Sequence, residues 1–148
     1  MLMDKITIAD IQTNVQAENW EDAIEKTSQL LLERGIIEQS YIDAMIQVVK
    51  ENGPYIVIGK HIALAHARPE CGVNAMGLTF STLNPPISFG ADGMDPVKLV
   101  ITLAATDSDA HVDLLAEIAE IFMDEERLEA LIEAESSEIF LQVLLDKS

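Results

Sequence analysis

Residues 97–105 read Val-Lys-Leu-Val-Ile-Thr-Leu-Ala-Ala, a mostly apolar run rich in β-branched side chains that contains a single charge. Because apolar residues occupy successive positions, both faces of a strand formed here would be hydrophobic. A run of this kind is typical of a strand that is buried on both sides of a sheet. We therefore expect a central β-strand at this place in the chain.

Three shorter segments that precede this run also favour strands. Residues 55–58 and 62–65 are short apolar runs, and residues 78–83 begin with the alternation of a half-buried strand. The middle of the chain is therefore expected to supply a β-sheet.

The two ends of the chain have helical patterns instead. In residues 20–35 an apolar stripe follows Asn19, a favourable N-cap, and Gly35 ends it. Further helices are expected over residues 41–51, about 125–134 and 136–145, and after residue 105, where Asp107 or Ser108 can provide the cap. Helices around a strand-rich centre predict an α/β fold: a mixed β-sheet flanked by helices in an α/β/α sandwich, as a single domain over residues 1–148.

Composition excludes several classes of protein. The 148 residues include 26 acidic and 9 basic side chains, a net charge of −17, yet 49% of the residues are hydrophobic. Enough apolar material for a core argues against disorder, and the acidic charge argues against nucleic-acid partners and anionic membranes. Cys71 is the lone cysteine, and neither a signal peptide nor a membrane-spanning apolar stretch is evident. We expect a cytoplasmic protein that does not insert into the membrane.

Reactive chemistry is most plausible at His66. This histidine directly follows the apolar run 62–65, and the ends of strands are common ligand sites in α/β folds. Pro69 biases Arg68 toward an extended conformation, which would place the Arg68 side chain on the same side as His66. Neutral imidazole is a competent nucleophile, and a guanidinium binds phosphate oxygens in a bidentate manner. The pair therefore indicates phosphate chemistry.

Other chemistries are poorly supported. His61 and His66 are five residues apart, so on a regular strand they would face opposite sides and could not share a metal ion. The chain also has no G-x-S-x-G elbow, and residues 90–93 lack the third glycine of a nucleotide fingerprint and favour a turn. We therefore expect no metal and no cofactor, and the sequence assigns no role to His61.

His111 has two interpretations. It falls in the first turn of the expected helix and shares a side of it with Leu114 and Leu115, so it could be a partly buried side chain that orients the helix start. A helix N-terminus also favours anions, so His111 could instead help to hold a phosphoryl group.

Four stretches together resemble a known family. They are residues 62–70 (Ile-Ala-Leu-Ala-His-Ala-Arg-Pro-Glu), 86–90 (Pro-Ile-Ser-Phe-Gly), 95–97 (Asp-Pro-Val) and 107–111 (Asp-Ser-Asp-Ala-His). In this order they resemble the enzyme IIA (EIIA) domains of the fructose–mannitol class, type 2, of the bacterial phosphoenolpyruvate-dependent sugar phosphotransferase system. Residues 50–57 and 104–107 look most like the ascorbate-specific branch.

The resemblance implies a phosphocarrier. The carrier protein HPr would donate a phosphoryl group to His66, with His111 as a second active-site histidine. The group would then pass to a cysteine of a cognate enzyme IIB, which phosphorylates the sugar as the membrane enzyme IIC imports it. The branch implies L-ascorbate as that sugar, and the family's fold is likewise a mixed sheet flanked by helices.

Two residues depart from the family's pattern. Ala65 stands where the family usually has proline, which loosens the backbone that enters the site. Lys50 stands where mannitol-type members have an arginine that supports the site; lysine keeps the charge but loses the planar fork. The resemblance therefore implies Lys50 as a second phosphoryl-binding candidate, in addition to Arg68.

The sequence is also compatible with two other functions. One is a regulatory EIIA-like domain that controls a transcription factor or another partner according to its phosphorylation state. The other is an interaction module whose histidines are not reactive.

Overall fold

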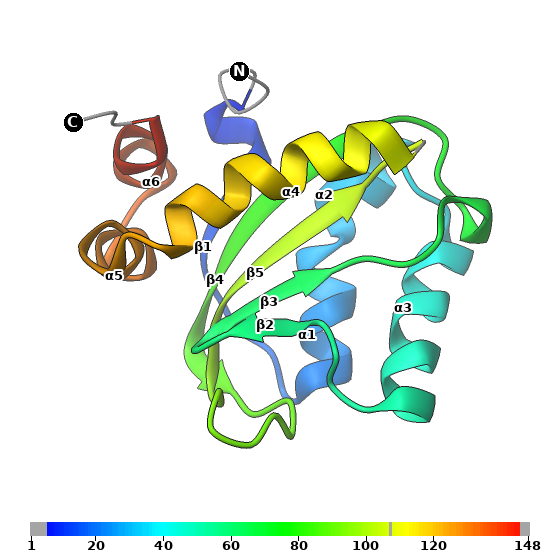
Figure 1. Ribbon diagram of the computed structural model, residues 1–148, viewed down its shortest axis with the longest axis horizontal. Helices are drawn as coiled ribbons and strands as arrows, with labels where there is room; N and C mark the ends of the chain where they lie inside the picture. Colours follow the sequence, from blue (N-terminus) through cyan, green and yellow to red (C-terminus); the bar gives the residue numbers. More distant parts are fainter. Residues whose placement is uncertain (1–5, 107, 146–148) are drawn as a thin grey trace.

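The computed structural model, which describes residues 6–106 and 108–145, contains a mixed five-stranded sheet with helices on both faces (Figure 1). Its strands are β1 (Ile11–Val15), β2 (Val57–Gly59), β3 (Ile62–Ala65), β4 (Gly77–Ile87) and β5 (Val97–Ala104). Their spatial order is β1-β4-β5-β3-β2, so β5 lies at the centre. It runs antiparallel to β4 and parallel to β3. The predicted fold class and the predicted central strand are confirmed.

Helices from the two ends of the chain cover opposite faces of the sheet (Figure 1). One layer holds α1 (Trp20–Thr27), α2 (Gln29–Glu33) and α3 (Gln39–Asn52), and the other holds α4 (Ser108–Phe122), α5 (Glu125–Glu133) and α6 (Ser137–Leu145). Val100 and Ala104 of β5 pack with the first layer, whereas Leu99 and Ile101 pack with the second. The alternation explains why β5 is apolar at successive positions.

The segment predicted as one helix over residues 20–35 forms two, α1 and α2. Its predicted start is confirmed, because the side chain of Asn19 accepts a hydrogen bond from the backbone N–H of Asp22 at 2.8 Å. The break falls at Ser28, whose buried hydroxyl donates to the carbonyl of Ile24 at 2.7 Å. A hydroxyl that bonds back to the preceding turn competes with the helical backbone pattern and favours a bend.

Strand β1 is an element that the sequence pattern does not predict. Its residues, Ile-Gln-Thr-Asn-Val, alternate weakly, and of the five only Ile11 is buried. It is an outermost strand of the sheet and pairs in parallel with β4, with Ile11 opposite Phe80. Its conformation therefore depends on a partner that is distant in the sequence rather than on a local hydrophobic pattern.

The hydroxyl of Tyr41 joins three elements of the fold. Tyr41 is buried in the first turn of α3, and its hydroxyl donates to the carbonyl of Leu103 in β5 at 2.7 Å. The same oxygen accepts a hydrogen bond from the backbone N–H of Ala67, just beyond β3, at 3.0 Å. Burial raises the pKa of Tyr41 to about 12, against the opposing effect of the hydrogen bond with Ala67.

Replacement of Tyr41 by Phe should lower the free energy of unfolding by about 1–3 kcal/mol near neutral pH, because the carbonyl of Leu103 would stay buried without its donor. The loss is measured by denaturant unfolding. In the wild type, the unfolded tyrosine loses its proton near pH 10, whereas the folded one keeps it until about pH 12. The free energy of unfolding of the wild type should therefore fall as the pH rises from about 10 to about 12. Tyr41→Phe has no hydroxyl to titrate, so its free energy of unfolding should fall less over the same range. Equal pH profiles for the two proteins would contradict the assignment.

Candidate functional site

Three strand ends meet at one edge of the sheet. Because β3 and β5 are parallel, with Ala65 opposite Thr102, their carboxyl ends lie together. The antiparallel β4 begins at the same edge, where Gly77 is opposite Ala104. The chain then leaves β5 and starts α4 here (Figure 1). An edge formed by carboxyl ends of strands, with a helix N-terminus beside it, is a favourable place to bind an anion.

His66 is the first residue after β3 at this edge, as predicted, and its side chain is half-buried. Its Nδ1 atom lies 2.8 Å from the carbonyl oxygen of Leu64. A carbonyl oxygen can only accept a hydrogen bond, so Nδ1 carries the proton. In the neutral ring the lone pair is then on Nε2, the nitrogen farther from the backbone.

Two tyrosines hold the peptide units around His66. The hydroxyl of Tyr55 donates to the carbonyl of His66 at 3.2 Å, and the Tyr41 hydroxyl contacts the next residue, Ala67. Neither tyrosine is among the site residues predicted from the sequence. Both occur in predicted elements, but a hydropathy pattern contains no signal for the direction of a hydroxyl group.

Arg68 lies two residues beyond His66. Its backbone is extended, with φ −69° and ψ 143°, as the following Pro69 predicts. The side chain is exposed, and it makes no ion pair with any residue of the described ranges. A guanidinium in this position is available to bind phosphoryl oxygens.

The other two candidates differ in what the structure shows. His111 lies in the first turn of α4, at the same edge as His66, but its side chain lies outside the described residues. Of the two predicted caps, Asp107 also lies outside them, and Ser108 is the first residue of α4. Lys50 lies in the last turn of α3, about 14 Å along the helix axis from Tyr41. Its ammonium is 3.3 Å from a carboxylate oxygen of Glu21 in α1. Binding of a phosphoryl group by Lys50 and His111 stays a prediction.

His61 lies at the opposite edge of the sheet. It precedes β3, so roughly 16 Å of extended chain separates it from His66. Its backbone is left-handed, with φ 72°, and its Nδ1 lies 2.7 Å from the carbonyl oxygen of Pro96. These contacts give His61 a structural role in the turn that leads into β3. Within the described part of the chain, no cluster of three or more His, Cys, Asp or Glu residues could hold a metal ion.

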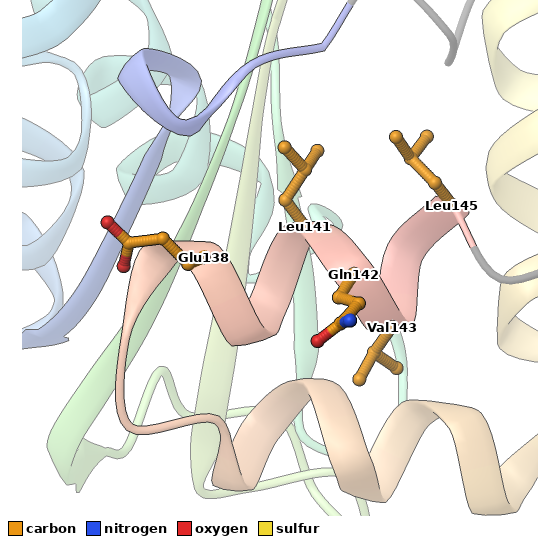
Figure 2. Close-up of a pocket in the computed structure, with 5 residues that line it drawn as sticks. All are labelled: Glu138, Leu141, Gln142, Val143 and Leu145. Carbon is orange, nitrogen blue, oxygen red and sulfur yellow. The ribbon is translucent and has the colours of Figure 1, made fainter.

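The structure also contains an open cavity of about 920 Å³, whose lining residues are shown in Figure 2. Residues of α6 line it, namely Glu138, Leu141, Gln142, Val143 and Leu145. Helix α6 packs beside α5 and β1, and two strands separate β1 from β3. The cavity therefore belongs to a different part of the molecule from His66. In the ranges that the structure describes, no helix is long and apolar enough to span a membrane.

Comparison with known proteins gives a consistent result. The sequence model of the family "Phosphoenolpyruvate-dependent sugar phosphotransferase system, EIIA 2" matches residues 5–147. The ascorbate-specific phosphotransferase system EIIA component of Escherichia coli K12 is 36% identical over 122 residues, which cover 82% of this chain and 79% of that protein.

Solved structures agree with the sequence comparison. The solution structure of a mannitol-specific cryptic phosphotransferase enzyme IIA from Escherichia coli superimposes with a TM-score of 0.87, at 31% identity and with 97% of each chain covered. The mannitol enzyme IIA of the same organism, in complex with phosphorylated enzyme IIB, gives a TM-score of 0.82 at 26% identity, over 95% of this chain and 96% of that one. The family match spans nearly the whole sequence, and the chain therefore belongs to the EIIA 2 family, the phosphoryl-carrying components of the phosphoenolpyruvate-dependent sugar phosphotransferase system.

Proposed function

We propose that His66 accepts a phosphoryl group from phospho-HPr through its Nε2 atom and passes it to a cysteine of a cognate enzyme IIB. The observation that carries this proposal is the hydrogen bond between His66 Nδ1 and the carbonyl of Leu64. It fixes the tautomer whose lone pair is on Nε2, at the edge where the strands end. The mannitol enzyme IIA, with which this chain shares its fold, has been solved with its phosphorylated enzyme IIB.

The transfer is an exchange between two imidazole nitrogens. The Nε2 lone pair of His66 forms the new P–N bond while the P–N bond to the donor histidine breaks, and the donor ring leaves with that electron pair. Positive charge develops on the ring of His66 during the attack. The Nδ1–H keeps its proton, and the carbonyl of Leu64 stabilises this charge as an acceptor. The step requires no cofactor.

Negative charge also spreads over the three equatorial oxygens of the phosphoryl group in the transition state. Arg68 is the proposed donor to these oxygens, because it is exposed, extended and two residues from His66. The first turn of α4, which contains His111, is the second proposed binding element, since the N-terminus of a helix favours anions. Preorganised donors of this kind supply most of the rate enhancement in phosphoryl transfer.

L-Ascorbate is the proposed sugar of the pathway, although an enzyme IIA does not itself contact the sugar. Support comes from the ascorbate-specific relative at 36% identity. The mannitol-specific structure at 31% identity supports the second candidate, mannitol. We place the protein in the cytoplasm, where it can meet both HPr and the enzyme IIB that works with the membrane enzyme IIC.

Incubation with enzyme I, HPr and phosphoenolpyruvate should add one phosphoryl group, detected by intact-protein mass spectrometry. His66→Ala should abolish the gain because it removes the proposed nucleophile, Nε2 of His66. His61→Ala is the matched control, since it removes a histidine from the opposite edge, and it should be labelled like the wild type. Undiminished labelling of His66→Ala would disprove the central assignment.

Arg68→Gln should slow the transfer from phospho-HPr by about 100-fold, the usual effect of removing one donor to a developing negative charge. His111→Ala should also reduce the rate without preventing labelling. Rapid-quench kinetics measures both effects. Lys60→Gln, which removes an exposed cation next to His61, serves as the control and should transfer at the wild-type rate. An Arg68→Gln protein as fast as this control would exclude Arg68 from the site.

Onward transfer distinguishes the sugars and the alternative function. Phosphorylated protein should lose its phosphoryl group faster to an ascorbate-type enzyme IIB than to a mannitol-type one, as followed by the mass of both proteins. The reverse order would assign the mannitol pathway. If no sugar-specific enzyme IIB accepts the group, the regulatory interpretation replaces the transport one.

A further inference from the structure

Tyr55 makes two distinct contacts with the residue on which the proposed function depends. Its hydroxyl donates to the backbone carbonyl of His66 at 3.2 Å. Its ring lies against the imidazole of the same residue, with the centroids 5.7 Å apart and the planes at 74°. This is the edge-to-face geometry that aromatic pairs prefer. One side chain thus restrains both the main chain and the ring of His66.

The backbone holds Tyr55 in place for these contacts. The N–H of Tyr55 donates to the carbonyl of Gly53 at 2.8 Å, which closes a tight turn after α3. The next residue, Ile56, is fully buried, and its carbonyl accepts a hydrogen bond from the N–H of Leu64 in β3 at 2.8 Å. Tyr55 is therefore anchored to the same strand that ends at His66.

The Tyr55 side chain is nevertheless not a core residue, because 41% of its surface is exposed. Burial raises the pKa of its hydroxyl above the ordinary value, so the group remains a hydrogen-bond donor at neutral pH. A half-exposed aromatic ring against a half-buried imidazole contributes little to the core, so core packing does not account for its contact with His66.

We propose that Tyr55 is a positioning residue for phosphoryl transfer, which orients the His66 ring so that Nε2 meets the incoming phosphorus in line. This inference rests on the proposed function of His66. Together with the Nδ1 bond to Leu64, the Tyr55 ring leaves the imidazole little freedom to rotate. In-line attack is sensitive to such freedom, because displacement of a reacting group by about 1 Å costs about 100-fold in rate.

Two substitutions separate the contributions of the ring and the hydroxyl. Tyr55→Leu removes both contacts and should slow transfer from phospho-HPr by about 10-fold, less than a full misplacement costs. Tyr55→Phe keeps the ring and should recover most of that rate. Ile58→Ala is the matched control: Ile58 is 40% exposed, a similar fraction to Tyr55, but it lines a depression against α5 instead of contacting His66. This control should transfer at the wild-type rate.

A spectroscopic measurement tests the positioning role without the reaction. In the unphosphorylated protein, ¹⁵N shifts of the His66 ring should report a protonated Nδ1 in the wild type, Tyr55→Phe and Ile58→Ala. In Tyr55→Leu the shifts should move toward the average of two tautomers. Wild-type shifts together with a wild-type rate in Tyr55→Leu would overturn the proposal. If the wild type takes no phosphoryl group, the proposed function fails, and unchanged shifts in Tyr55→Leu would then overturn the role of Tyr55 separately.

Discussion

The site depends on the parallel pairing of β3 with β5. With Ile62 opposite Leu99 and Ala65 opposite Thr102, the register brings both carboxyl ends to one edge of the sheet. His66 follows one of these ends, and the start of α4 follows the other. An antiparallel arrangement would have placed them at opposite edges. The hydroxyl of Tyr41 connects the ends of β3 and β5, because it accepts a hydrogen bond from the N–H of Ala67 and donates one to the carbonyl of Leu103.

The same contacts bear on Ala65, the position at which the sequence departs from the pattern of the family that it resembles, which has proline there. A proline would fix φ of the residue before His66 but would lack an N–H. Ala65 instead is fully buried as the last residue of β3, paired with Thr102. The chain is therefore held on both sides of His66, by the sheet before it and by Tyr41 after it. The rigidity that the pyrrolidine ring of a proline would give the backbone at this position comes here from hydrogen bonds to other elements of the fold.

Features that depend on residues near in the sequence were predictable, and features that depend on distant partners were not. The strands around β5 and the N-cap at Asn19 were predictable because the signal is local: an apolar run, or one side chain near its own helix. The position of His66 and the extended backbone of Arg68 followed from the strand end and from Pro69. The edge strand β1 was missed because β4 stabilises it from a distance. Tyr41 and Tyr55 were missed for the same reason, since their partners come from other elements.

Charge acts on this site at two length scales. At long range the net charge of −17 repels small anionic donors and favours a partner that presents its phosphoryl group on a basic face. Several cations of the described residues are engaged by carboxylates, as Lys26, Arg34 and Lys50 are. Arg68 is not paired within those ranges, but at a distance its single positive charge is outweighed by the net charge of −17, whereas in the proposed transfer it acts at contact on the phosphoryl oxygens. The acidic surface thus favours a protein donor over a small anionic one, and in the proposed transfer Arg68 acts only once that donor has docked.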